Sequence, residues 1–411
     1  MRTSIISVVC ACFLFAIPLH GRFLVDDAEL VDQEERLSTE NYNDIVSYRY
    51  PLYFASLWQS RNVGYRVNAG SLNASRFYFE EEIKLETDRL QRLGFAFNRS
   101  RMEDFLERRS EDEIRLFASP FDHLRVSLLG DGGADKEYGD MGMAIALYEG
   151  AANEIEFFYW SVDHYYDQKK QKPEDKRSKN SFTTGAKGQL KLEDFSAKFY
   201  YERDHPLLWQ RLSEGYEYAY LRQFAKFGGT YHVADHQDYY FDIVREQKEE
   251  GKVFYASQNS KSYVKDSIQY ELGRNWYGDD DQSIGIMKFD RRVQYVQSGN
   301  FQSFEESISP ESSKRNEWGL FYSRYLRRSW FNQQFGLYSN RVFIYEKNPD
   351  ITFSNWETKI QWLMDFEIQK GCQLVLNTTW DVDQLYKDYP YKGDQTFKPW
   401  GGGNIQILAA F

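Results

Sequence analysis

Proline, cysteine and long apolar runs are all scarce in this chain of 411 residues. Only 9 prolines occur, which suits long paired strands because proline cannot donate a hydrogen bond to a β-ladder. No stretch beyond residue 21 reaches the roughly 20 consecutive apolar residues that a membrane-spanning helix needs. Basic residues are the minority charge, 51 against 62 acids, and the net charge of −11 argues against a nucleic-acid partner.

The first 21 residues have the pattern of a secretory signal peptide. Arg2 supplies the charged end, a short apolar core follows, and cleavage is expected near Gly21. An N-terminal membrane anchor is the alternative, and the shortness of the apolar core speaks against it. Two of the 3 cysteines lie in this segment, so the mature chain keeps Cys372 alone and forms no intramolecular disulfide.

The composition is very aromatic for so hydrophilic a chain. Phe, Trp and Tyr make up 18% of the residues, including 31 Tyr and 31 Phe, yet the mean hydropathy is −0.68. Strands with one lipid-facing and one wet face combine these properties, because only every second side chain is apolar. Six tryptophans near expected strand ends fit aromatic girdles at the lipid headgroups: Trp160, Trp209, Trp276, Trp318, Trp356 and Trp400.

Strict alternation of side-chain type is clearest near the C-terminus. One face of an expected strand is almost wholly apolar or aromatic: Trp356, Thr358, Ile360, Trp362, Met364, Phe366 and Ile368. Lys370 and Gly371 then allow a tight turn, and a second alternating strand follows. The chain ends on a third apolar strand, in which Ile405, Ile407 and the terminal Phe411 share one face.

This ending resembles the C-terminal signal of Gram-negative outer-membrane β-barrels, in which the last strand pairs with the first to close the ring. The departure is Ala409, where that class usually carries a larger residue. The resemblance implies a place in the bacterial outer membrane, contact with its lipid and lipopolysaccharide, and recognition of Ile405, Ile407 and Phe411 by the barrel-assembly machinery. A soluble β-sandwich or propeller would leave the signal peptide and Phe411 unexplained, and no blade-length repeat occurs.

We therefore expect an all-β fold, a transmembrane antiparallel up-and-down β-barrel. Counting hairpins back from the C-terminus gives about 16 strands, within a range of roughly 14–18, with short periplasmic turns and longer extracellular loops. The chain divides into a signal peptide over 1–21, a periplasmic or lumen-entering segment with a short helix over 22–73, and the barrel over 74–411.

Connections of two lengths alternate along the expected barrel. Residues 246–262 are expected to form one of the long polar loops, and residues 227–229 one of the short turns. Residues 101–113 carry too many charges for a lipid-facing strand, so we expect a loop or short helix there. The alternation of short and long connections is typical of outer-membrane barrels.

Charged residues alternate with the apolar ones on several expected strands and point to the opposite face. We expect these to line the lumen: Glu80, Glu82, Lys84, Glu357, Lys359, Asp365, Glu367, Asp381 and Asp383. Buried unpaired in a dry barrel, each charge would cost several kcal/mol, which favours a pore of some width. Acids outnumber bases in this set, so modest cation selectivity is expected.

Histidine shows an unusual pattern, since four of the 6 follow an aspartate directly. Adjacent strand residues point to opposite faces, so such a pair cannot act as an acid–base dyad by itself. Residues on different strands could form such a dyad. Asp163, His164, Asp204 and His205 fall at expected extracellular strand ends, where barrel proteases resembling omptins place Asp and His catalysts. A plain polar rim is the alternative. No motif for a metal, nucleotide or other cofactor occurs, and we expect no enzymatic activity.

Three classes of function fit these patterns. The first is a porin-like channel or facilitator for a polar solute or an envelope polymer. Its many tyrosines would serve either as stacking faces for sugars or as simple wall packing. The second is a non-transport barrel that acts as an adhesin, receptor or structural anchor through its long loops. The third is a rim hydrolase built on the Asp-His pairs.

Overall fold

A computed structural model of the chain describes it from residue 62 onward, with gaps. The described residues are 62–71, 77–87, 92–104, 108–132, 138–150, 152–166, 176–177, 181–205, 207–213, 215–234, 236–256, 260–277, 280–298, 312–327, 331–346, 351–383 and 400–410. The expected signal peptide, most of the segment over 22–73, and Phe411 lie outside them.

Every regular element in the described residues is a β-strand. In chain order they are β1 (Val63–Ser71), β2 (Phe77–Glu86), β3 (Leu93–Asp104), β4 (Arg108–Phe121), β5 (Leu124–Gly132), β6 (Tyr138–Glu149), β7 (Asn153–Tyr166), β8 (Lys176–Arg177), β9 (Phe182–Lys191), β10 (Phe195–Asp204), β11 (Leu207–Arg211), β12 (Tyr216–Ala234), β13 (Gln237–Phe254), β14 (Ser260–Trp276), β15 (Asp280–Ser298), β16 (Ser312–Arg327), β17 (Phe331–Glu346), β18 (Ile351–Gln369), β19 (Cys372–Asp383) and β20 (Trp400–Ala410). In this part of the chain no helix is long and apolar enough to cross a membrane.

The strands form one closed antiparallel ring. β1 closes it by pairing with β20, with Gly64 opposite Ala410 and Ser71 opposite Gly403. The short strands β8 and β11 pair with each other beside β12, so the ring itself passes from β7 to β9 and from β10 to β12. It holds 18 strands, which corrects the expectation of about 16.

Two-residue turns close hairpins at one end of the barrel. Asp122 and His123 connect β4 to β5, and Lys370 and Gly371 connect β18 to β19. The φ angles of 75° at His123 and 85° at Gly371 are of the kind that tight turns between twisted strands require. The connections at the opposite end are longer, such as residues 299–311 between β15 and β16. We call these the short-turn end and the long-loop end.

Several segments expected to be connections or to precede the barrel are strands instead. Residues 101–113 belong mostly to the β3–β4 hairpin, residues 227–229 lie in the middle of β12, and 246–262 is mostly the β13–β14 hairpin. The ring also begins before residue 74, because β1 pairs with both β2 and β20. Charged or glycine-containing segments form strands here because neighbouring strands supply ion-pair partners and packing surfaces for them.

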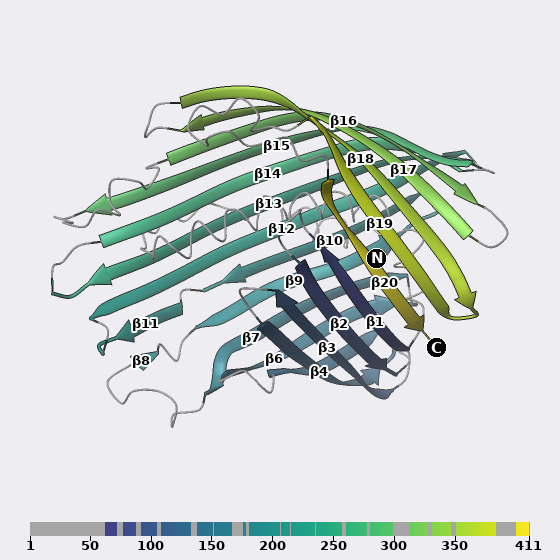
Figure 1. Ribbon diagram of the computed structural model, residues 1–411. Helices are drawn as coiled ribbons and strands as arrows, with labels where there is room; N and C mark the ends of the chain where they lie inside the picture. The colour runs from purple at the N-terminus through teal and green to yellow at the C-terminus, as the bar shows by residue number, and fades with distance from the viewer. Residues whose placement is uncertain are drawn as a thin grey trace.

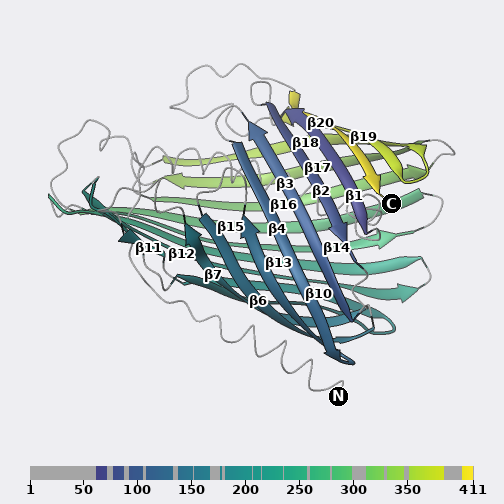
Figure 2. The same cartoon turned by 90° about the horizontal axis from the view of Figure 1, so that it is seen from below.

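The ring is uneven in strand length. Strands β12 to β18 have 16–19 residues, whereas the ring strands from β1 to β10 have 9–14. The long strands form the broad teal and green wall of Figure 1, and β1 to β4 cross their direction in the view from below (Figure 2). On both flanks the extra length lies at the long-loop end, because β12 continues past the paired part of β10 and β18 past that of β19. The long-strand wall (β12 to β18) therefore overhangs its neighbours.

Candidate functional site

Side chains alternate between an apolar outer face and a largely polar inner face of the barrel. On β6, Met141, Met143 and Ile145 are 40%, 54% and 47% exposed, while Ala144 and Ala146, which alternate with them, are each 1% exposed. The outer belt continues round the ring through Leu128, Leu272, Ile286, Leu320, Leu337 and Ile407. The buried inner set includes Arg125, Glu156, Lys265, Glu271, Glu317, Gln361 and Asp365. An apolar exterior over a charged interior is the inverse of a soluble globular core and suits a surrounding bilayer.

The predicted lumen residues on β2 share the inner face with the buried Asn68 of β1. Asn68 donates from Nδ2 to Glu80 Oε2 at 2.8 Å, and Glu82 forms an ion pair with Arg66 of β1. Lys84 pairs with the next acid on its own strand at 3.2 Å. All three predicted residues are therefore held by polar partners along the β1–β2 hairpin.

The predicted lumen residues on β18 lie on one face of that strand. Glu357 and Lys359 form an ion pair at 3.1 Å. Asp365 is 3% exposed and accepts a hydrogen bond from Asn332 Nδ2 at 3.4 Å. Glu367, two residues further along, is exposed. β18 therefore carries both inward charges that have partners and, near the short-turn end, the exposed acid Glu367.

The two predicted acids on β19 sit at the long-loop end of the β18–β19 pairing. Asp381 lies opposite Lys359, which places it on the same face as the predicted lumen residues of β18. Asp383 lies opposite Thr358, and the register shifts between these two pairings. Their side chains are outside the described residues, so their lumen role stays a prediction.

A buried carboxylate links four strands of the inner wall. Glu156 on β7 is 1% exposed and accepts two hydrogen bonds from the Arg115 guanidinium on β4, at 2.6 and 3.1 Å. Lys187 on β9 pairs with it at 3.1 Å, and Arg125 on β5 pairs with the neighbouring Glu154. These charge-assisted contacts satisfy an acid that would otherwise be costly to bury.

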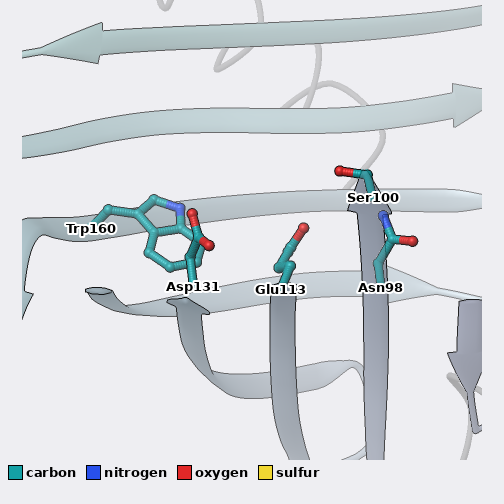
Figure 3. A pocket seen from close by; sticks show the side chains of 5 residues that line it. All are labelled: Asn98, Ser100, Glu113, Asp131 and Trp160. Carbon is teal, nitrogen blue, oxygen red and sulfur yellow. The ribbon is translucent and has the colours of Figure 1, made fainter. Parts of the chain in front are cut away.

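A cavity of about 110 Å³ opens on the inner face of β3, β4, β5 and β7. It is lined by Asn98, Ser100, Glu113, Asp131 and Trp160. Figure 3 shows the carboxylate of Asp131 beside the indole of Trp160, with Glu113, Asn98 and Ser100 projecting from the adjacent strands. A flat aromatic face next to carboxylates, an amide and a hydroxyl can hold a polar solute by packing and hydrogen bonding.

Trp160 reaches this cavity because the strand beside it carries a glycine. Gly142 on β6 lies opposite Trp160, and a side chain at Gly142 would meet the indole ring at 3.0 Å. The indole therefore lies over the β6 backbone on the inner face. The expectation that Trp160 belongs to an outer, lipid-facing girdle is wrong, since it lines the cavity.

Other inward aromatic rings fill space in the long-strand wall. Tyr240 lies over Gly273 and Phe321 lies over Gly285, where any side chain would collide with the rings. Phe321 and Tyr338 stack with centroids 6.4 Å apart, and they are 3% and 4% exposed. Rings so deeply buried pack the wall and offer no free face to a sugar.

Asp204 and His205 are not arranged as a catalytic dyad. Asp204, the last residue of β10, accepts a hydrogen bond from Thr183 Oγ1 at 2.7 Å. His205 follows the strand and stacks on Phe182 with ring centroids 3.8 Å apart. Burial, and then the charge of the nearby Arg203, lower the pKa of His205, so it is neutral at neutral pH. The two side chains therefore engage different partners.

Asp163 and His164 lie in β7, towards its long-loop end. The pairing of β7 with β9 extends to Ser161 opposite Phe182, so both residues lie beyond the paired stretch. Their side chains are outside the described residues. The rim role of Asp163 and His164 therefore stays a prediction.

The predicted assembly residues lie on β20 beside the closing seam. Ile405 and Ile407 are 55% and 46% exposed on the outer face, whereas Leu408 on the inner face is 2% exposed. Phe411 follows the strand and is outside the described residues. The outer face of β20 thus presents exposed isoleucines next to β1.

The cavity residues were not predicted as a site, and Trp160 was expected only in an outer girdle. Asn98 and Ser100 alternate with Phe95 and Phe97 on β3, so they are the inward set of an alternating strand. That alternation was the available signal. The charges over 101–113 predict a loop, whereas most of these residues continue β3 and β4, which carry part of the cavity lining.

No protein-family model matches the sequence, and a search of curated proteins finds no match either. Among solved structures, OccAB3 of Acinetobacter baumannii is 12% identical, with 85% of this chain and 98% of that chain covered at a TM-score of 0.43. OccK10 of Pseudomonas aeruginosa is 12% identical, with coverages of 85% and 98% and a TM-score of 0.40. OprD of Pseudomonas aeruginosa is 10% identical, with coverages of 86% and 95% and a TM-score of 0.40. These likenesses are too distant to transfer a function or a substrate.

The chain's own geometry nevertheless defines its architecture. A closed antiparallel ring of 18 strands with an apolar outer belt and a polar inner face has the architecture of the outer-membrane β-barrels. The resemblance carried by the C-terminal strand is thereby confirmed for the fold.

Proposed function

We propose that this protein is a porin-like channel of the Gram-negative outer membrane that passes a polar solute or an envelope polymer. The observation that carries the proposal is the inner face of the closed ring. From β1 round to β20 this face bears acidic, basic and amide side chains. Such a face is stable when water or a polar solute solvates it. In an apolar core, burying the same charged and polar groups would cost free energy.

The size of the ring supports a solvated interior. Barrels of about 8 strands are filled by their own side chains, whereas barrels of about 16–18 strands leave room for an aqueous channel. The 18 strands of this ring fall in the second group. Inward aromatic rings and ion pairs line this interior, which fits a selective channel.

The cavity beside Trp160 indicates the kind of solute. Its lining offers an aromatic face, two carboxylates, an amide and a hydroxyl, and no aliphatic side chain. A neutral or cationic solute with several hydrogen-bond donors suits this lining. Simple wall packing accounts for the buried Phe321 and Tyr338, so the sugar path suggested by the tyrosine content does not run over them.

The proposal includes the orientation and biogenesis of the barrel. The short-turn end would face the periplasm and the long-loop end the exterior, as in other outer-membrane barrels. Insertion would depend on the barrel-assembly machinery reading Ile405, Ile407 and Phe411, and the outer belt would contact lipid and lipopolysaccharide. Deleting Phe411 should therefore lower the yield of folded barrel in cells, with normal amounts of precursor.

Liposome swelling tests the channel function. Purified folded protein should make vesicles permeable to small sugars and amino acids, with a sharp loss of rate as solute size increases. The same protein boiled in detergent is the control and should give no swelling. A folded barrel is recognised by resistance to SDS at room temperature and a mobility shift on boiling; a barrel that passes this check yet leaves vesicles impermeable would favour the adhesin, receptor or anchor role.

A further inference from the structure

The apolar belt of the long-strand wall ends abruptly on the side of the long loops. On β14 the outward Leu272 and Tyr270 are exposed, and Asp266, further towards the long loops, is exposed as well. Asp266 forms an ion pair with the outward Arg245 of β13 at 3.8 Å. On β15, Lys288 lies opposite Tyr270. Because charged side chains are destabilising against lipid tails, these charges mark the edge of the hydrocarbon layer.

Cations and indole rings alternate along this edge on the outer face of β15 to β18. Lys288 lies opposite Trp318 of β16, and Trp318 lies opposite Arg341 of β17. Arg341 in turn lies opposite Trp356 of β18. The two indoles are 53% and 49% exposed. Neighbouring strands are about 4.8 Å apart, so the row spans roughly 14 Å of the wall seen in Figure 1. Exposed tryptophans at this level are typical of a headgroup girdle.

The cations of the row lie close to the aromatic faces. Lys288 Nζ is 5.1 Å from the centroid of the Trp318 ring, and Arg341 Cζ is 5.7 Å from that of Trp356. Arg341 also donates a hydrogen bond from Nη2 to Ser354 Oγ at 2.9 Å. A cation–π contact and a neutral acceptor position a guanidinium without neutralising its charge. Arg341 is therefore held in place and keeps its charge for an anionic partner.

Positive charge exceeds negative charge on this part of the outer face. Lys288 forms an ion pair with Asp290, which is the only outward acid with a described side chain on β15 to β18. Within the described part of the chain, neither Arg341 nor the exposed Arg292 of β15 forms an ion pair with a carboxylate. Asp266 lies opposite Arg292 in the register, but its ion pair is the one with β13. We call Lys288, Arg292 and Arg341 the outer cationic patch; its local potential is positive.

An apolar surface adjoins the outer cationic patch on the side of the short turns. Leu320 of β16 and Leu337 of β17 are 61% and 45% exposed there. A ligand that spans both regions needs anionic groups at one end and acyl chains at the other. Guanidinium groups bind phosphate through paired hydrogen bonds, and indole faces pack against the apolar faces of sugar rings. A phosphorylated glycolipid combines all three features.

We propose that the outer cationic patch binds lipid A, the phosphorylated glycolipid that anchors lipopolysaccharide. Its phosphates would meet Arg292 and Arg341, its sugars would pack on the indoles of the row, and its acyl chains would lie along the belt. The site rests on the proposed orientation, with the long-loop end outside, because lipopolysaccharide occupies the outer leaflet. Anionic phospholipids share the phosphate and the acyl chains but have no sugar rings. The patch is outside the lumen, so binding does not depend on conduction.

Binding is measured on the folded full-length mature protein, stripped of lipid in a neutral detergent at low salt. Lipid A in the same detergent is titrated in, and native mass spectrometry records the fraction of barrels that retain it. Lipid A from which the phosphates have been removed is the comparison for charge. Phosphatidylglycerol is the comparison for the sugar.

The test variant is Arg292→Gln with Arg341→Gln. The matched control is Arg99→Gln with Arg203→Gln, which removes the same charge from outward positions on β3 and β10. The heat-dependent gel shift verifies that each variant is folded. Planar-bilayer conductance is recorded for the same samples and should be equal in all of them, because none of the four arginines faces the lumen.

We expect the wild type to retain lipid A, and to bind dephosphorylated lipid A and phosphatidylglycerol about tenfold more weakly. The test variant should lose about tenfold in affinity for lipid A, while the control variant should match the wild type. Equal loss in both variants, equal binding of dephosphorylated lipid A, or no retention by the wild type would overturn the site. Phosphatidylglycerol bound as tightly as lipid A would overturn the glycolipid assignment.

The two proposals fail separately. A barrel that retains lipid A but carries no current would contradict the channel function alone. A conducting barrel that retains no lipid A would contradict the lipid site alone.

Discussion

Asn404 on β20 donates a hydrogen bond from Nδ2 to Asn68 Oδ1 on β1, at 2.8 Å. The two residues are 336 positions apart in sequence and meet at the seam where the ring closes. Asn68 in turn donates to Glu80 Oε2 on β2 at 2.8 Å. A continuous chain of inward side chains therefore joins the last strand to the first two.

Asn68→Leu should destabilise the barrel more than Asn404→Ala. The first change breaks both hydrogen bonds and leaves Glu80 and Asn404 without them, at a cost of about 2–3 kcal/mol, whereas the second breaks one at about 1 kcal/mol. Urea unfolding followed by the gel shift measures both. Because the residues share one bond, the double variant should lose less than the sum of the single losses. Strict additivity would show that the seam bond is absent.

Ile145→Lys should harm the barrel far more than Glu113→Lys. Ile145 lies on the outer belt near the middle of β6, where a lysine costs about 2–4 kcal/mol in the bilayer. Glu113 is exposed on the inner face of β4, where water solvates a new cation. Folding yield into phospholipid vesicles and urea midpoints give the comparison. The reverse order of effects would invert the assignment of inner and outer faces.

Glu156→Gln should lower stability by about 3–5 kcal/mol, because it leaves Arg115 and Lys187 facing a buried neutral group. The control is Glu113→Gln, a substitution of the same kind at an exposed inner position, which should change stability by less than about 0.5 kcal/mol. Unfolding in urea, monitored by tryptophan fluorescence, distinguishes the two. Equal stability of the two variants would mean that the ion pairs across β4, β7 and β9 contribute nothing.

The channel should show modest cation selectivity that weakens as salt rises. Inward acids such as Glu357 and Glu367 raise the local concentration of cations, and the effect is screened over about 8 Å at physiological salt. Asp381→Asn with Asp383→Asn should reduce the selectivity without lowering the yield of folded barrel. The measurement is the reversal potential under a salt gradient. Anion preference at low salt would contradict this and the expected lumen role of the two β19 acids.

The C-terminal strands could be predicted from sequence because two local signals agree there. Met364, Phe366 and Ile368 alternate strictly with polar residues, and the turn at Lys370 and Gly371 fixes where the strand ends. Period-two alternation with a defined turn sets both face and register. The β18–β19 hairpin of the structure starts from that same turn.

Other segments form strands that their local sequence does not indicate, because neighbouring strands supply their partners. The charges over 101–113 suggest a loop, yet Arg99 and Asp112 pair across β3 and β4 at 2.6 and 2.8 Å. Gly229 suggests a turn, yet Phe241 packs in the space that a side chain there would need. The cavity could not be predicted either, because it combines side chains from four strands. The spacing of these residues in the sequence does not show that they lie close together.

Conductance in planar lipid bilayers tests the central proposal most directly. Folded wild-type protein, verified by its gel shift, should insert in discrete steps and give an ohmic current at low voltage. The boiled sample serves as the control for detergent artefacts and should stay silent. Reproducible ohmic steps with cation preference are the predicted result; a folded barrel that inserts yet carries no current would contradict a channel.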